Sequence, residues 1–363
     1  MENTTMSKRI FAILCAVMLI TLALAGCNDA PAEAPTAEVP PAEAPDQETP
    51  EAEVPAAEPV ADSGFTFGYM AYNLADMWNQ FSMDAFVWCA DMKGVEVLYV
   101  DAQSDTGYQA TQAQEMIDLG VDAISIFPVT TEVGATVVHM ANEAGIPIAV
   151  ENIFMPDDES AGDIVGQIAC RYSDVGYAAI EYAAGAFPEC KMLWVQGAPG
   201  LGVTEDYKAG VDAALELYGD LVEIAGYVNG EFAMETAYKT TLNFIKSGRE
   251  FDIIFAQNDL MAFGSFNALK ERGMEDIPII STGGSPQGYE MMQQGQQYAN
   301  MTAPVNIQGV TIFDFLWRYV NGVSIPDNKI PLPIIPIDFP TIDQWIQWYD
   351  VQAAYDYIGG IQP

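Results

Sequence analysis

Histidine is almost absent from this sequence, and no motif of a common enzyme family takes its place. His139 is the single histidine among 363 residues, and it lies inside a run typical of a helix rather than of a catalytic base. Gly284 to Gly288 (GSPQG) has the wrong spacing for a Gly-x-Ser-x-Gly nucleophile elbow. A Walker loop, a dinucleotide-binding glycine triplet, an EF-hand-like loop and clustered metal ligands are also missing. These absences argue against an enzyme, and we predict no cofactor and no metal site.

Basic residues are scarce as well. The chain has 13 Lys and Arg against 51 Asp and Glu, a formal net charge of −38. Eleven of the acids and two of the bases precede Gly64, so the remainder carries a net charge near −29. Such a charge disfavours nucleic acid and anionic lipid surfaces as partners. Two interpretations stay open: a solvated acidic surface and a site for a cationic ligand.

Cysteine is rare, and its spacing matches no redox or metal-binding motif. Cys15, Cys27, Cys89, Cys170 and Cys190 are the five cysteines. The first two lie in the N-terminal segment described next, and the other three cannot all pair. One disulfide is permitted outside the cytoplasm, but we expect buried single thiols.

The N-terminus has the pattern of a secretory signal. Lys8 and Arg9 precede an apolar run from Ile10 to Ala25, and Leu24 to Cys27 (LAGC) resembles a bacterial lipobox. In signals of that kind the cysteine becomes the acylated first residue. We therefore expect residues 1–27 to be a lipoprotein signal peptide, Cys27 to be the lipid anchor, and the chain to be extracytoplasmic. A plain transmembrane anchor is the alternative, although a run of this length is marginal for spanning a bilayer.

Residues 28–63 are almost entirely Pro, Ala, Glu and Val. A segment of this composition buries too little large apolar surface to offset its ordering entropy. We predict a disordered linker that holds the folded part away from the membrane.

Strand and helix patterns alternate from residue 65 onward, which predicts parallel sheets covered by helices on both faces. Strands are expected at 65–71, 95–100, 122–127, 146–150, 191–195, 222–227, 251–255 and 277–280, with helices between them at 78–93, 106–119, 133–144, 174–186, 204–218 and 234–247. The pattern restarts after a break near 162–169. Two similar α/β halves with a ligand between them are the expected architecture.

One stretch of the sequence carries a specific resemblance to a known protein family. Residues 251–273 read FDIIFAQNDLMAFGSFNALKERG, an apolar strand, a polar turn and a helix that ends at Gly273. The turn Gln257 to Ala262 (QNDLMA), with Gly264 and Ala268 to Lys270, resembles the signature of the ribose-binding-like (type I) periplasmic sugar-binding proteins. The resemblance extends over most of residues 65–340.

The resemblance implies a fold of two doubly wound parallel-sheet lobes joined by a three-segment hinge. By position we place the crossings near Gln167, Ala303 and Pro331. Lobe boundaries are then expected at 65–167 plus about 304–330 for the N-terminal lobe, and at 168–303 plus about 331–363 for the C-terminal lobe.

The resemblance also implies ligand contacts. Trp78 and Phe232 match aromatic positions that stack on a sugar ring from opposite lobes, and Asn258 matches a sugar-contacting asparagine. Asp76 and Asn73 lie near the first aromatic. Asn152 matches an aspartate that binds sugar hydroxyls, with neighbouring Glu151 as the other option.

Several positions depart from the family pattern. Glu205 replaces an arginine, Gly283 an aspartate and Ala303 a glutamine, and the loss of such fixed polar contacts argues against free ribose. Glu205, Asp76 and Glu151 could instead meet an amine, as in an amino sugar, an inosamine or a polyamine-like solute. Arg171, near the first hinge, could contact the ligand or pair with Glu205.

The N-terminal signal and the family resemblance together predict a monomeric, membrane-tethered solute-binding lipoprotein. It would deliver a small polar solute, such as a sugar or an amino sugar, to an ABC permease by closing two lobes around it. The alternative is a receptor whose closed form docks on a membrane signalling protein.

Overall fold

The computed structural model describes residues 63–200 and 202–361. The predicted signal peptide, the anchor Cys27 and all of the predicted linker except Ser63 lie outside these ranges. Ser63 donates backbone and side-chain hydrogen bonds to the carbonyl of Gly94 at 2.9 and 2.8 Å. Within the described ranges, no helix is both long enough and apolar enough to cross a membrane.

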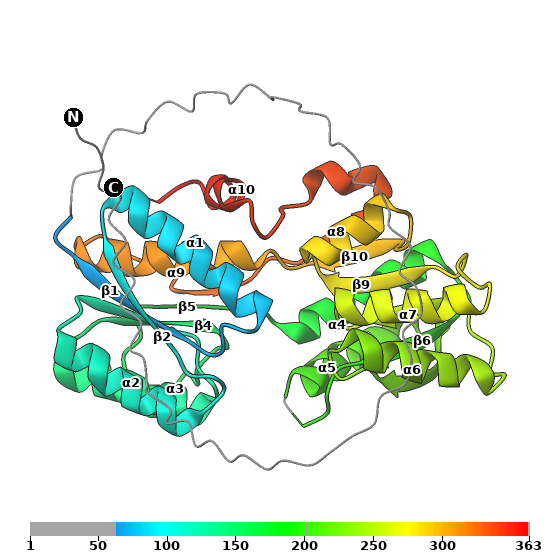
Figure 1. Ribbon diagram of the computed structural model, residues 1–363, viewed down its shortest axis with the longest axis horizontal. Coiled ribbons are helices and arrows are strands. Elements are labelled where there is room, and N and C mark those ends of the chain that lie inside the picture. Colours follow the sequence, from blue (N-terminus) through cyan, green and yellow to red (C-terminus); the bar gives the residue numbers. More distant parts are fainter. Residues whose placement is uncertain (1–62, 201, 362–363) are drawn as a thin grey trace, which may run out of the picture. The chain divides into compact units, whose positions relative to one another are not determined.

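The chain builds two six-stranded sheets (Figure 1). The first has the order β11-β5-β4-β3-β1-β2, and we call the part built on it lobe 1. The second, in lobe 2, has the order β12-β10-β9-β8-β6-β7, and only the pairing of β12 with β10 is antiparallel. The predicted α/β fold of two parallel-sheet lobes is confirmed.

The strands of lobe 1 are β1 (Thr66–Ala71), β2 (Glu96–Asp101), β3 (Ala123–Ile126), β4 (Ile148–Asn152), β5 (Gly166–Ala169) and β11 (Lys329–Pro331). Its helices are α1 (Met77–Lys93), α2 (Thr106–Leu119), α3 (Thr131–Ala144), the short η1 (Glu159–Ala161) and α9 (Val305–Val320). In Figure 1, α1 and α9 lie on one side of the sheet, and α2 and α3 lie on the other.

The strands of lobe 2 are β6 (Cys190–Gln196), β7 (Val222–Asn229), β8 (Ile253–Ala256), β9 (Ile279–Gly283), β10 (Ala299–Thr302) and β12 (Ile335–Asp338). Its helices are α4 (Tyr172–Ala186), α5 (Val203–Tyr218), α6 (Met234–Lys246), α7 (Asp259–Glu271), α8 (Pro286–Gln293) and η2 (Phe339–Gln344). Helices α4 and α5 contact each other on one face, as do α6 and α7 on the other.

Strand alternation divides the core between the two faces of each sheet. In β1, Phe67 and Tyr69 pack toward α1 and α9, whereas Met70 packs toward α2 and α3. In β8, Phe255 packs toward α4 and α5, whereas Ile254 packs toward α6 and α7. The apolar cluster beneath α1 and α9 continues into lobe 2, so one core spans both lobes.

The cysteines of the described part are buried single thiols, as predicted: Cys89, Cys170 and Cys190.

The chain passes between the sheets at 170–171, 303–304 and 332–334. These crossings follow directly from the carboxyl ends of β5, β10 and β11, so the carboxyl ends of both sheets face the junction between the lobes. Open α/β sheets bind ligands at such ends.

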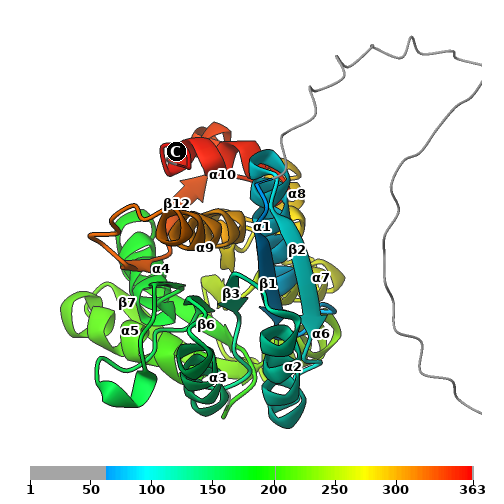
Figure 2. The ribbon, with the colours of Figure 1, turned by 90° about the vertical axis from the view of Figure 1, so that its left-hand side faces the viewer.

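The end of the chain departs from the predicted lobe boundary. Residues from about 331 were expected in the C-terminal lobe, and β12 and η2 do lie there. Helix α10 (Val351–Tyr357) instead packs on α9 of lobe 1, and Figure 2 shows the two helices side by side. The assignment is therefore wrong for this helix, because Ala354 and neighbouring apolar side chains are buried against lobe 1.

Candidate ligand-binding site

Trp78 and Asn152, predicted ligand contacts far apart in sequence, lie together at the carboxyl ends of β1 and β4. The indole Nε1 of Trp78 donates to Oδ1 of Asn152 at 3.0 Å. Asn152 has φ +71°, a left-handed conformation that asparagine tolerates better than most residues. This bond fixes the plane of the indole beside an amide, an arrangement suited to a ring that is apolar on its face and polar on its rim.

Asp76 and Asn73 shape the loop that precedes α1. Asp76 caps α1 by accepting from the Trp78 backbone N–H at 3.0 Å. Asn73 accepts from the Ala75 N–H and donates to Ser104 Oγ, both at 2.9 Å. The side chain of Asn73 is thus engaged within lobe 1, while Asp76 remains exposed.

The carboxyl of Asp76 is partly shielded from water although the residue is exposed. This loss of hydration raises the pKa of the carboxyl, against the opposing effect of the hydrogen bond from Trp78. Burial is also the main cause that raises the pKa of Tyr172 in α4, and the carboxylates of Asp76 and Asp206 add to it.

Glu151 is enclosed within lobe 1. Its side chain is completely buried and accepts hydrogen bonds from Ser82 Oγ, from Ser125 Oγ at 3.2 Å and from Gln308 Nε2 at 2.8 Å. Burial raises the pKa of this carboxyl despite these donors. Of the two neighbours considered from the sequence, Asn152 is the one that is partly accessible.

Glu205 and Arg171 are not brought together. Glu205 accepts from the backbone N–H groups of Gly200 and Gly202 at 2.8 and 3.0 Å, and these bonds, that from Gly200 first, lower the pKa of its carboxyl. Arg171 lies over the ring of Phe154, 5.4 Å from its centre. The ion pair considered from the sequence is absent from the part of the chain that the structure describes.

Phe232 and Asn258 lie together in lobe 2. Asn258 caps α7 through Oδ1, which accepts from the Met261 N–H at 2.8 Å, and its Nδ2 donates to the Phe232 carbonyl at 3.3 Å. The Phe232 ring lies against Gly197, where an added Cβ would be 2.0 Å from the ring. Glycine at 197 is therefore needed for this placement.

Two further residues at these strand ends were not singled out as ligand contacts from the sequence. Gln257 is buried and accepts from the Gly197 N–H at 2.6 Å, while its Nε2 has no partner among the described residues. Trp348 lies against Trp78, with ring centres 5.4 Å apart and planes at 89°. In the sequence, the aromatic residues between Trp345 and Tyr349 are the only signal that could have indicated a role for this region.

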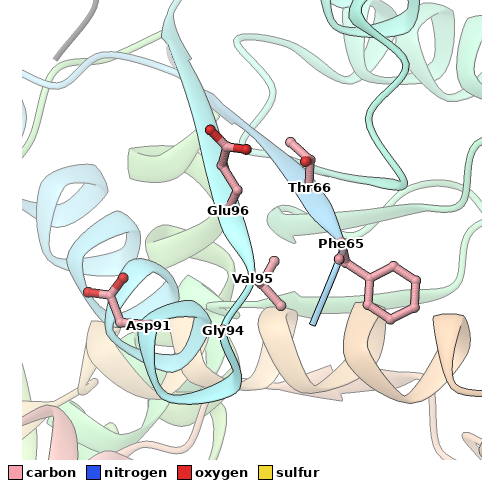
Figure 3. A pocket seen from close by; sticks show the side chains of 7 residues that line it. Phe65, Thr66, Asp91, Gly94, Val95 and Glu96 are labelled. Carbon is pink, nitrogen blue, oxygen red and sulfur yellow. The ribbon is translucent and has the colours of Figure 1, made fainter. Parts of the chain in front are cut away.

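A separate surface hollow of about 400 Å³ lies at the opposite end of lobe 1 (Figure 3). It is lined by Gly64, Phe65, Thr66, Asp91, Gly94, Val95 and Glu96. These residues surround the beginning of β1 and β2, whereas Trp78 follows the carboxyl end of β1. The hollow is therefore distinct from the predicted ligand contacts.

Residues 67–324 match the family model for the periplasmic binding protein domain. The chain belongs to this family. The predicted resemblance to type I periplasmic sugar-binding proteins is thereby confirmed.

Characterised relatives of this periplasmic binding protein carry the names of different sugars. The ribose import binding protein RbsB of Salmonella typhimurium is 24% identical over 229 residues, covering 62% of this chain and 75% of the relative. The galactofuranose-binding protein YtfQ of Escherichia coli is 25% identical over 254 residues, covering 66% and 77%. The relatives are binding proteins, in keeping with the prediction from sequence that this protein is not an enzyme.

A solved structure has the same fold. An ABC transporter solute binding protein from Bacillus halodurans C-125 with bound myo-inositol superposes with a TM-score of 0.68 at 24% identity, covering 80% of this chain and 98% of that one. At this identity the likeness shows the fold of the periplasmic binding protein, not its ligand.

Proposed function

We propose that this periplasmic binding protein captures a small ring-shaped polar solute, a sugar or a cyclic polyol, and delivers it to an ABC importer. The observation that carries the proposal is the pairing of Trp78 with Asn152 at the carboxyl edge of lobe 1. Phe232 and Asn258 form a similar aromatic and amide pair at the carboxyl edge of lobe 2. Relatives named for ribose and galactofuranose support this ligand class.

The proposed contacts divide between apolar and polar parts of the ligand. Indole and phenyl faces cover the C–H face of a ring, since aromatic side chains supply large apolar surface with fixed geometry. Asn152, Asn258 and the unpartnered Nε2 of Gln257 would serve hydroxyl groups. Closure of the lobes would remove water from these bonds, and the closed form would then dock on the permease.

A finer form of the proposal is a ligand that carries an amine. Of the three acids that suggested it, Glu151 is enclosed and Glu205 is engaged by backbone N–H groups. Asp76 remains exposed and accepts from the backbone N–H of Trp78. An amino sugar or inosamine would therefore place its ammonium group near Asp76.

A thermal-shift screen of the purified protein tests the ligand class. The panel contains ribose, galactose, myo-inositol, an amino sugar, an inosamine and a polyamine. A ligand present at about 1,000 times its Kd adds roughly 4 kcal/mol of stability. A shift with neutral rings supports the sugar or polyol proposal, and a shift with the amines alone supports the Asp76 form. No shift with any compound would count against the ligand classes of the panel and favour a different solute or the signalling receptor.

Replacement of Trp78 tests the stacking role. We expect Trp78→Ala to weaken binding of the compound found in the screen at least tenfold, about 1.4 kcal/mol, because the ring loses its apolar cover. Isothermal titration calorimetry measures the change. Tyr319→Ala is the control, since Tyr319 is an exposed aromatic residue in the last turn of α9. Unchanged affinity in the Trp78 variant would contradict the role.

We also propose that Cys27 carries a lipid and that residues 28–63 tether the protein outside the cytoplasm. This rests on the sequence of the signal alone. Cys27→Ser should abolish incorporation of labelled fatty acid into the protein, whereas Cys15→Ser should leave it unchanged. Continued labelling of the Cys27 variant would contradict the anchor.

A further inference from the structure

The last part of the chain lies on both lobes. We call residues 339–361 the C-terminal strap; they follow β12 and lie beyond the residues that match the family model. In Figure 1 the strap runs from the α8 side of lobe 2 to the α1 side of lobe 1. It is a fourth connection between the lobes, after the three crossings at 170–171, 303–304 and 332–334.

Each end of the strap is fixed to a different lobe. In lobe 2, Trp345 is buried with Met292 and Ile337, and its Nε1 donates to the Gly284 carbonyl at 3.1 Å. In lobe 1, Tyr355 lies against Trp88 with ring centres 5.7 Å apart. The end of the strap therefore cannot follow lobe 2 without breaking contacts with lobe 1.

The middle of the strap is held by α9. The buried amide Nδ2 of Asn306 donates to the carbonyls of Gln347 and Asp350, both at 2.9 Å. The two carbonyls lie on either side of Trp348 in the sequence. The bonds therefore fix the backbone that carries its indole.

Trp348 touches both lobes with one side chain. It is 5% exposed. Its ring meets those of Trp78 and Phe81 at 5.4 and 5.8 Å, both in edge-to-face geometry. Its Nε1 donates to the Gly283 carbonyl, at the carboxyl end of β9, at 3.1 Å.

We propose that Trp348 is a positioning residue that ties the lobes together and holds Trp78 in place for the ligand. A rotation of lobe 2 away from lobe 1 must break either the bond to Gly283 or the contact with Trp78, because Asn306 holds the strap backbone. The strap thereby couples the angle between the lobes to the orientation of Trp78. The tie itself is independent of the ligand, and its effect on binding rests on the function proposed above.

Hydrogen exchange of the full chain without ligand tests the tie. In Trp348→Ala we expect exchange to speed up about tenfold or more in two segments, the first turn of α1 and residues 281–288, because both lose their shared partner. Trp348→Phe keeps the ring and loses the hydrogen bond, so it should speed exchange near Gly283 and leave α1 close to the unaltered protein. The Phe variant also serves if the Ala variant fails to fold.

Trp345→Phe is the matched control. It removes an indole bond of equal length to the neighbouring carbonyl, but Trp345 is buried entirely among lobe 2 residues. Exchange should rise near Gly284 alone. If α1 is unaffected in Trp348→Ala, or affected equally in Trp345→Phe, the proposed tie is wrong.

Affinities for D-ribose and myo-inositol separate this proposal from the function. If either probe binds the unaltered protein, Trp348→Ala should weaken it about tenfold, and Trp345→Phe should not. If neither probe binds, the sugar proposal loses support while the exchange experiment still decides the tie.

Discussion

Glu151 and Asn152, adjacent residues at the end of β4, have opposite surroundings. Strand alternation turns Glu151 toward α1 and α9, where hydroxyl and amide donors surround a buried carboxyl. Asn152, the last residue of the strand, has φ +71° and meets Trp78 in the first turn of α1. The sequence placed both residues at the site, and the end of the strand distinguished them.

The buried carboxyl makes stability depend on pH. Since burial raises the pKa of Glu151 above its ordinary value of 4.5, the folded state holds a proton that the unfolded state has released. Stability therefore falls as pH rises from about 4.5 toward the folded pKa, by about 1.4 kcal/mol per pH unit at most.

We expect Glu151→Gln to remove this dependence, because its amide does not titrate. Urea unfolding between about pH 4 and 8 should show the unaltered protein losing stability relative to the variant as pH rises. Glu216→Gln, at an exposed position, is the control. A constant difference between the Glu151 variant and the unaltered protein across the range would contradict the expectation.

At the scale of elements, α4 and α5 approach each other where glycines face the partner backbone. A Cβ on Gly176 would lie 2.4 Å from the Tyr207 carbonyl oxygen, and one on Gly210 would lie 1.8 Å from that of Ser173. The approach allows Ser173 to donate its N–H to Asp206 at 3.0 Å. This pairing sets the position of Tyr172 at the junction.

Gly210→Ala should destabilise the protein by about 1–3 kcal/mol, because the added methyl forces the helices apart. Gly185→Ala, on α4 with nothing within 4 Å of the added atom, should instead be neutral or add up to about 1 kcal/mol. Chemical denaturation measures both. Similar effects from the two substitutions would show that helix propensity, not packing, decides.

At the scale of the whole molecule, the excess of acids is the dominant electrostatic feature. The chain carries a formal charge of −38, and part of this charge lies on the exposed surface that includes Asp76. Repulsion among like charges opposes the compact state, and salt screens it.

Raising NaCl from about 0.02 to 0.2 M should therefore raise the melting temperature, with little further gain at higher concentrations, because the Debye length at 0.2 M is already only about 7 Å. Differential scanning fluorimetry measures the curve. KCl should act in the same way, since screening does not distinguish the cations. Stabilisation by one cation only would indicate a specific cation site instead.

Local pattern was sufficient for most strands and helices and for the family. Apolar runs and glycine caps marked most elements from β1 to β9, and the turn from Gln257 to Ala262 pointed to the fold. These signals are carried by residues close together in sequence. The short strands β5, β10, β11 and β12 are interrupted by glycine, proline or polar residues, so they lack the apolar run that marks the equally short β3 and β8. Helix α9 is buried through most of its length, so it lacks the polar face that marks a helix.

The sequence by itself thus determined the α/β architecture, the family and the presence of Trp78, Asn152, Phe232 and Asn258 at strand ends. Tertiary structure alone decided that Glu151 is enclosed, that Glu205 is bound by its own loop, and that Trp348 joins Trp78 to Gly283. The reason is the separation along the chain between the residues that interact. Secondary structure follows from residues that are neighbours in the chain. The partners of a buried carboxyl or an indole, such as Gln308 for Glu151 and Trp78 for Trp348, come from far along the chain and meet only in the folded protein.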